Sequence, residues 1–216
     1  MRTDARRTAR PARHAGVTQA DDAGPSGVAP RSRREDIIEA AAECFSVAGY
    51  DATAMRDIAR KTGMLAGSIY YHFASKEEIL IAVHEEAVRR IMNHVCAGID
   101  PSASPWDRLL QASANYAEVL VAERKFAEVV VTEFPRRRDD ALRAVLVSHR
   151  NAFEKVFRDI VDDLPLAPWV DRTLWRLALL SQLAWSVVWY RSKGGKTPAE
   201  IAVHMVDLLR RQTEAE

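Results

Sequence analysis

The residues best suited to chemistry lie in a short segment, residues 65–71, which reads Leu-Ala-Gly-Ser-Ile-Tyr-Tyr. Ala66, Gly67 and Ser68 are small, and small residues let a helix backbone approach another surface closely. The Ser68 hydroxyl can hydrogen-bond a base or a phosphate, and the Ala66 methyl group can touch the methyl group of a thymine. This pattern favours contact with the major groove of DNA.

Residues around this segment could contact the DNA backbone. Tyr70, Tyr71 and His72 lie at its end, where a hydroxyl or an imidazole can reach phosphate. Tyr70 could equally be a core aromatic, and His72 could pack in the core. Lys76 begins the next helix, where an anion is favoured, although a lone lysine is usually solvated. The predicted DNA contacts are Thr53, Arg56, Ala66, Gly67, Ser68, Tyr70, Tyr71, His72 and Lys76.

A helix-turn-helix would position these side chains. We expect a helix over residues 54–61, capped by Thr53, then a break at Gly63 and a second short helix over residues 65–71. In such a unit the first helix supports and the second enters the major groove. Ile37, Ala41 and Phe45 share one face of a preceding helix that begins at Arg33 and ends before Gly49.

Helical periodicity continues to the end of the chain. Ser75-Lys-Glu-Glu is a capping box for a helix that extends toward Ile99. Further helices are expected near residues 106–121, 124–133, 138–162, 169–191 and 198–212, and no stretch alternates with the period of a strand. The predicted fold is all-α with about nine helices. Its parts are a disordered arginine-rich tail (1–32), a DNA-binding domain (33–78) and a ligand-binding and dimerisation domain (79–216).

The segment from Arg33 to Leu80 resembles the DNA-binding domain of TetR-family transcriptional regulators. It departs from the family at Leu65, where many members carry a helix-capping serine. The matching residues are Ile38, Ala41, Ala42, Phe45, Gly49, Tyr50, Thr53, Asp57-Ile58-Ala59, Gly63, Gly67-Ser68-Ile69-Tyr70-Tyr71-His72-Phe73 and Ser75-Lys76-Glu77.

The resemblance implies that the last two helices pair with those of a second copy. Residues 174–190 are apolar on nearly all sides, so this helix needs cover on two faces, one from its own domain and one from a partner. A homodimer would place two recognition helices one turn of DNA apart, which suits a palindromic operator.

Aromatic residues gather in the C-terminal half, where they either form a core or line an apolar pocket. The predicted ligand-binding residues are Trp106, Tyr116, Phe126, Phe153, Trp185 and Trp189. Residues 185–201 resemble regulators of lipid, steroid and aromatic-acid catabolism, several of which respond to acyl-CoA thioesters. The cations available for the phosphates of such a ligand are Arg136-Arg137-Arg138, Arg150 and Lys155.

Charge and composition narrow the function further. The net charge is only +1, and residues 33–75 carry five basic and six acidic side chains, so DNA contacts must be few and well placed. The arginine-rich tail could add phosphate contacts or be a simple extension. The two cysteines and the polar N-terminus fit a cytoplasmic protein, and no stretch fits a membrane span.

Neither a catalytic motif nor metal-ligand spacing is present, so no enzyme, cofactor or metal is expected. We therefore expect a dimeric repressor that a small apolar effector, such as an acyl-CoA thioester, releases from its operator. The alternative is a constitutive architectural DNA-binding protein without an effector.

Overall fold

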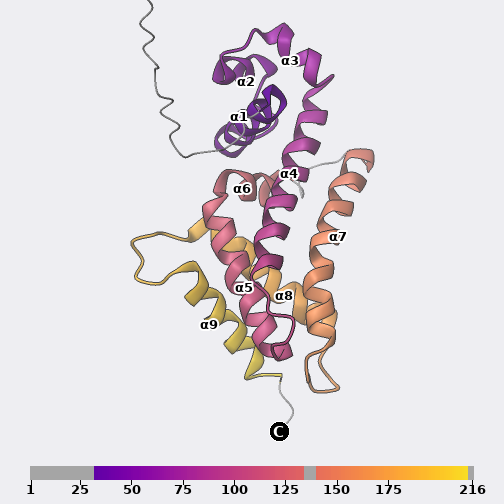
Figure 1. Cartoon of the computed structure of the whole chain (residues 1–216), viewed down its shortest axis with the longest axis vertical. Helices are drawn as coiled ribbons and strands as arrows, with labels where there is room; N and C mark the ends of the chain where they lie inside the picture. The colour runs from indigo at the N-terminus through magenta and orange to yellow at the C-terminus, as the bar shows by residue number, and fades with distance from the viewer. Residues whose placement is uncertain (1–31, 134–139, 214–216) are drawn as a thin grey trace, which may run out of the picture. The chain divides into compact units, whose positions relative to one another are not determined.

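The computed structural model describes residues 32–133 and 140–213, and within these ranges it contains nine helices and no strand (Figure 1). The all-α prediction is therefore confirmed. The helices are α1 (Arg33–Ala48), α2 (Met55–Thr62), α3 (Ala66–His72), α4 (Lys76–Ala97), α5 (Pro105–Ala122), α6 (Arg124–Glu133), α7 (Asp140–Asp162), α8 (Arg172–Trp189) and α9 (Pro198–Arg210). The predicted tail, apart from Ser32, lies outside the described residues.

Local capping explains most of these boundaries. The Ser32 hydroxyl accepts a hydrogen bond from the Glu35 amide, and the Glu35 carboxylate accepts one from the Ser32 amide, so α1 begins at the predicted residue. Asp171 accepts hydrogen bonds from two amides at the start of α8. This cap explains why α8 begins at Arg172 rather than near residue 169.

The cap of α2 differs from the prediction. Ala54, not Thr53, is the N-cap residue, and its amide donates to the Asp57 carboxylate at 3.0 Å. Gly63 ends α2 in the left-handed region, with φ of 67°, and so allows the tight turn into α3. The helix-turn-helix therefore forms as predicted, with a different first cap.

A first hydrophobic core joins the helix-turn-helix to later parts of the chain. It contains the apolar faces of α1, α2 and α3 and the N-terminal half of α4. It also contains Phe126 and Val129 from α6 and Leu142 and Leu146 from α7. Helix α1 packs on α6, and α4 packs on both α6 and α7, so this core links the helix-turn-helix to α6 and α7.

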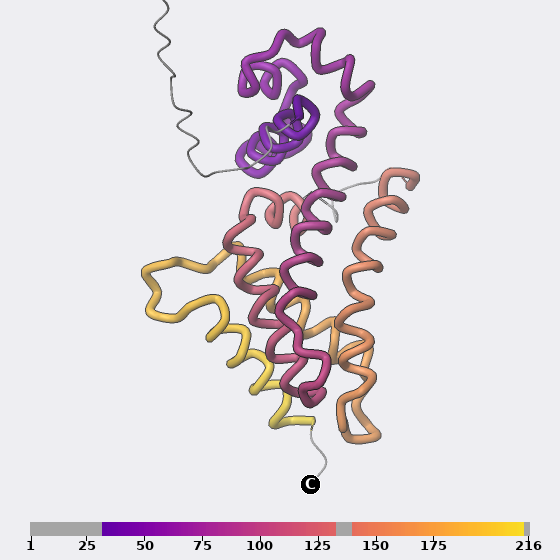
Figure 2. Tube along the Cα trace, viewed as in Figure 1, coloured from indigo at the N-terminus to yellow at the C-terminus, as the bar shows by residue number. Residues whose placement is uncertain are grey.

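A second core lies between the C-terminal half of α4 and helices α5, α7, α8 and α9. Helix α4 contributes residues to both cores. The tube in Figure 2 shows its backbone running without a break from the N-terminal helices to the C-terminal ones. A displacement at one end of α4 therefore reaches both cores.

No helix in the described ranges is both long and apolar enough to cross a membrane.

Candidate functional site

Helix α3 presents small and hydroxyl-bearing residues to the surface. Ala66, Gly67 and Ser68 are all exposed, while Ile69 is fully buried and anchors the helix in the first core. Tyr70 and Tyr71 are also exposed, whereas Phe73 is buried. A side chain added at Gly67 would meet no atom of the protein within 4 Å. The surface predicted to approach DNA is therefore open.

The cations of α2 differ in their partners. Arg60 pairs with Asp57 at 3.0 Å, and Lys61 pairs with Glu43 on α1. Arg56 is exposed and has no ion pair with any residue that the structure describes. Among the three cations, Arg56 is the one whose charge is not already countered.

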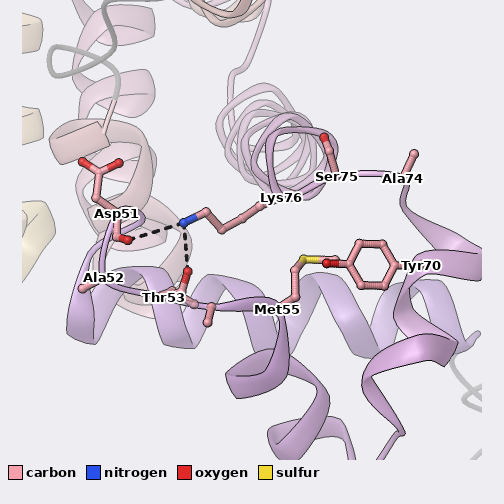
Figure 3. A pocket seen from close by; sticks show the side chains of 9 residues that line it. Asp51, Ala52, Thr53, Met55, Tyr70, Ala74, Ser75 and Lys76 are labelled. Carbon is pink, nitrogen blue, oxygen red and sulfur yellow. Dashed lines mark hydrogen bonds between the residues drawn. The ribbon is translucent and has the colours of Figure 1, made fainter.

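Lys76 turns back into the protein (Figure 3). Its ammonium donates to the carbonyl oxygens of Thr53 at 2.9 Å and Asp51 at 3.5 Å, the two bonds drawn in Figure 3. It also donates to the carbonyl oxygen of Tyr50 at 2.8 Å and lies 4.3 Å from the centre of the Tyr50 ring. These contacts hold the turn between α1 and α2. Lys76 is thus placed to position α2 rather than to reach out to phosphate, which is not what the sequence suggested.

Thr53 is buried, and its hydroxyl donates to the Gly49 carbonyl at 2.8 Å. The hydroxyl faces inward, so the prediction that this side chain contacts DNA is not supported. A hollow beside it lies between the starts of α2 and α4 and is lined by residues 51–55, Tyr70 and residues 74–76 (Figure 3). The first N–H groups of a helix lack partners within the helix, so this hollow is suited to an anion.

A mostly apolar pocket of about 320 Å³ lies among α4, α5, α6, α7 and α8. Tyr116, Phe153 and Trp185 line it, as the sequence suggested. Sequence reasoning missed its aliphatic walls because nothing distinguishes such residues from ordinary core positions. These walls are Val88, Ile91, Val130, Val131, Leu177, Leu180 and Ala184.

Three predicted ligand-binding residues lie elsewhere. Trp106 is buried against Trp175 and lies under the Arg210 guanidinium, and Phe126 is fully buried in the first core. Trp189 is half-exposed and does not line the pocket. The aromatic content of the sequence did not indicate which face of its helix each ring would occupy.

The cations predicted for the phosphates of a ligand are only partly described. Arg136, Arg137 and Arg138 lie outside the described residues, and Lys155 pairs with Asp159 at the surface.

One wall of the pocket is charged. Glu154 is buried and bonds to Arg176 at 2.8 Å and to Arg150 at 3.1 Å. Burial, and then the nearby charge of Glu154, raises the pKa of the Tyr116 hydroxyl above its usual value. An apolar cavity with a few fixed polar groups is the usual form of a small-molecule site.

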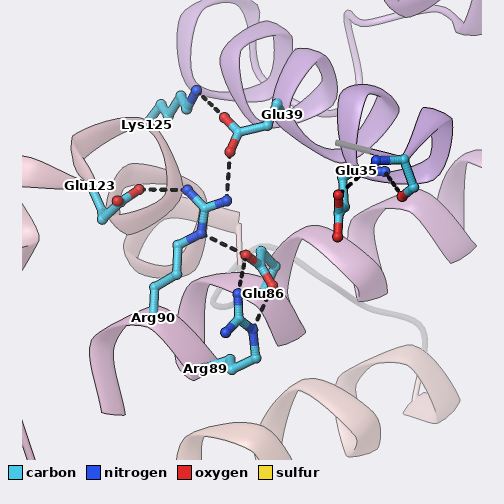
Figure 4. A network of polar contacts seen from close by, with 8 residues as sticks. Glu35, Glu39, Glu86, Arg89, Arg90, Glu123 and Lys125 are labelled. Atoms are coloured by element: carbon cyan, nitrogen blue, oxygen red, sulfur yellow. Dashed lines mark hydrogen bonds and ion pairs between the residues drawn. The ribbon is translucent and has the colours of Figure 1, made fainter. Parts of the chain in front are cut away.

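A charged cluster connects α1, α4 and α6 (Figure 4). Arg90 bonds to Glu39 at 2.5 Å, to Glu86 at 2.7 Å and to Glu123 at 2.8 Å, and Lys125 also bonds to Glu39. Burial would raise the pKa of Glu39, but the hydrogen bonds from Lys125 and Arg90 outweigh it and lower that pKa. The cluster is therefore charged at neutral pH.

Helices α8 and α9 leave apolar side chains uncovered. Leu174 is 65% exposed, Trp185 58% and Leu208 62%, and Leu177, Val188 and Trp189 are also exposed. On its other face, α8 is covered by its own domain as predicted, because Trp175, Leu179 and Leu183 are buried in the second core.

Among the described residues no cluster of three or more potential metal ligands occurs.

Sequence and structure comparisons agree with this arrangement. Residues 37–83 match the model of the bacterial regulatory proteins of the tetR family, and residues 102–213 match the tetracyclin repressor-like C-terminal domain. The HTH-type transcriptional repressor KstR2 of Mycolicibacterium smegmatis is 30% identical over 178 residues, which cover 79% of this chain and 85% of KstR2.

Two solved structures have the same fold. A tetR-family regulatory protein from Rhodococcus RHA1 aligns with a TM-score of 0.76 and 27% identity, covering 86% of this chain and all of that protein. AibR, solved with isovaleryl coenzyme A and operator DNA, aligns with a TM-score of 0.72 and 23% identity, covering 82% of this chain and 97% of AibR. The latter likeness concerns the fold.

Helices α2 and α3, joined by the tight turn at Gly63, form a helix-turn-helix, and residues 37–83 match a family of DNA-binding regulators, so the protein is a helix-turn-helix DNA-binding protein. More narrowly, it belongs to the tetR family of bacterial regulatory proteins. It is a DNA-binding transcriptional regulator and not an enzyme.

Proposed function

We propose that the protein is a dimeric repressor that binds a palindromic operator in the bacterial cytoplasm and is released by a small apolar effector. The observation that carries this proposal is the position of α6. Phe126 and Val129 of α6 are buried in the core of the DNA-binding helices, while Val130 and Val131 line the pocket. An effector that displaces this wall therefore acts on the packing of α1.

The proposed DNA contacts follow from exposure. Helix α3 enters the major groove with Ala66, Gly67 and Ser68 against the bases. Arg56 and the hydroxyls of Tyr70 and Tyr71 bind the DNA backbone, with His72 at the edge. A phosphate occupies the hollow at the starts of α2 and α4.

The exposed apolar residues of α8 and α9 support the proposed dimer. Leu174, Trp185 and Leu208 are large and uncovered, and such a group on a folded protein marks an interaction surface. A second copy is the occupant that a palindromic operator requires.

The pocket supports an effector with an apolar body. Its volume lies at the lower end of the range for ligand sites, so it suits an acyl group better than a whole coenzyme conjugate. Its exposed lining residues, Arg150, Leu177, Ser181 and Trp185, form the mouth. The coenzyme part of an acyl-CoA thioester would extend outward past Arg150.

The charged cluster supports the proposed coupling. Arg90 of α4 lies 4.3 Å from the Phe126 ring centre and also holds Glu39 of α1. Movement of α6 is thereby opposed by contacts with both α1 and α4. An effector that prefers a shifted α6 shifts the population toward a dimer whose recognition helices are spaced wrongly for DNA.

A panel of CoA thioesters and the matching free acids tests this function. We expect at least one thioester to raise the melting temperature and to release the protein from its operator in a gel-shift assay. Ala184→Phe should fill the pocket and abolish release by the effector while leaving operator binding intact. The control Ala122→Phe, at an exposed site outside the pocket, should leave both operator binding and release intact. Operator binding that no compound changes would favour the constitutive architectural alternative.

A further inference from the structure

The recognition helix lacks the side chains that read bases by paired hydrogen bonds. Its seven residues are Ala-Gly-Ser-Ile-Tyr-Tyr-His, with no arginine, lysine, asparagine, glutamine or acid among them. Paired contacts to guanine need arginine or lysine, and those to adenine need asparagine or glutamine. A lone hydroxyl, as in Ser68, bonds to several bases and discriminates weakly. Sequence recognition by α3 must use another signal.

Leu65 supplies such a signal. It is the N-cap residue of α3, makes no capping hydrogen bond, and has 80% of its side chain exposed. A single exposed leucine is ordinary on a protein surface. This one, however, lies directly beside Ala66, at the start of the helix that we propose enters the major groove.

In the major groove, the apolar group that distinguishes one base pair from another is the methyl group of thymine. A leucine side chain placed against a phosphate would gain no favourable apolar contact and would remove water from the anion. The same side chain placed against a methyl group removes both apolar surfaces from water. The small residues Ala66 and Gly67 leave room for this close approach.

We propose that Leu65, with Ala66 beside it, is a specificity-determining residue that reads thymine methyl groups in each operator half-site. The proposal rests on the DNA-binding role proposed for α3. It predicts an operator with thymines at fixed positions opposite the start of this helix. It also explains how a helix without charged residues can select a sequence.

Replacing thymine by uracil removes the methyl group and leaves every hydrogen-bonding group in place, so it isolates the proposed contact. The operator is first selected from random duplex DNA with the full-length wild-type protein. Each thymine is then replaced by uracil, one symmetric pair of positions at a time. We expect one or two positions per half-site where the affinity falls about fourfold for each methyl group lost, the factor for exposing one buried methyl.

The Leu65→Ala variant should bind the thymine duplex as weakly as the wild type binds the uracil duplex, and uracil should then change its affinity less than twofold. Val47→Ala, at an equally exposed aliphatic residue on α1, should retain the wild-type affinity and the wild-type response to uracil.

Failure of the proposal and failure of the proposed function give different results. If selection yields an operator but no uracil position affects the wild type, or if Leu65→Ala remains as sensitive as the wild type, Leu65 does not read thymine. If selection with the wild type enriches no sequence at all, operator binding itself is wrong and the reading of thymine falls with it.

Discussion

At the scale of single residues, exposure decides which side chains of the helix-turn-helix can meet DNA. Gly67 is the clearest case because its surroundings within the protein are empty. A side chain at this position would not clash with any described part of the free protein, so packing does not explain why the residue is glycine. Close approach to DNA is the reason that we propose.

Gly67→Ala should therefore separate folding from binding. We expect the melting temperature to stay equal or rise, because alanine favours a helix over glycine by up to about 1 kcal/mol. Operator affinity should fall about 5- to 150-fold if the added methyl group meets the groove floor, as a clash of about 1–3 kcal/mol would cause. Calorimetry and a gel-shift titration measure the two effects. Unchanged affinity would mean that the backbone of α3 stays away from the bases.

Lys76 illustrates how a tertiary contact changes the role of a residue. Its position at the start of α4 suggested a phosphate contact, but its ammonium is bonded to the carbonyls of the turn between α1 and α2. The sequence could not indicate this, because Tyr50 and Lys76 are 26 residues apart and come together only through folding.

Lys76→Met should lower the free energy of unfolding by about 1–3 kcal/mol, since it leaves those carbonyls without their charged donor. Lys61→Met removes only a surface ion pair and should cost less than about 1 kcal/mol. Urea unfolding of the two variants tests this difference. Equal, small losses would return Lys76 to the set of simple DNA contacts.

At the scale of elements, local signals predicted the helices well and the pocket poorly. Helix boundaries depend on caps within a few residues of sequence, and the cap of α4 at Ser75 was predicted in this way. The pocket depends on which face of each helix turns inward after five helices assemble. That is why Trp106 and Phe126 were expected in the pocket but lie in cores, while Val130 and Val131 were overlooked.

The cluster around Arg90 is an element-scale feature, because it joins three helices through one side chain. Arg90→Met should ease the movement of α6, so the effector should bind at least as tightly. The effector-induced loss of operator affinity, which in allosteric proteins is typically about 5- to 150-fold, should be smaller. Arg89→Met is the matched control, because Arg89 is exposed and, among the described residues, its ion pair is with Glu86 on its own helix. Operator titrations with and without effector give the two ratios. Equal ratios in both variants would exclude Arg90 from the coupling.

The contact between α4 and α7 should respond to pH. Buried His84 has Nδ1 3.4 Å from Nδ1 of His149, and burial, together with the charge of His149, lowers the pKa of His84 from 6.5 to about 4. Between these values the unfolded chain binds the proton and the folded chain does not. The free energy of unfolding therefore falls as the pH drops below 6.5, by about 1.4 kcal/mol per pH unit for this group.

Replacement of His84 by glutamine should remove this dependence. We expect the loss of stability between pH 7 and pH 5 to be about 2 kcal/mol smaller in His84→Gln than in the wild type. His94→Gln, at an exposed histidine of the same helix, is the control and should resemble the wild type. Urea unfolding at the two pH values measures the difference. Identical losses in all three proteins would show that His84 accepts a proton in the folded state.

At the scale of the whole molecule, the two surfaces with proposed partners lie on different helices. The recognition surface is formed by α2, α3 and the start of α4, and the uncovered apolar surface by α8 and α9. Trp185 belongs both to the pocket and to the apolar surface. A variant at Trp185 would therefore disturb effector binding and dimerisation together, so dimerisation is better tested elsewhere.

Leu174 and Leu208 allow that test because both are well exposed and neither lines the pocket. A protein with Leu174→Glu and Leu208→Glu should be monomeric at micromolar concentration in sedimentation experiments, since buried glutamates without partners oppose association. A monomer binds only one half-site, so operator affinity should fall at least about a hundredfold, while binding to DNA with a single half-site should match that of the wild type. Helical content should not change. A double variant that remains dimeric and binds the full operator normally would place the dimer interface on another surface.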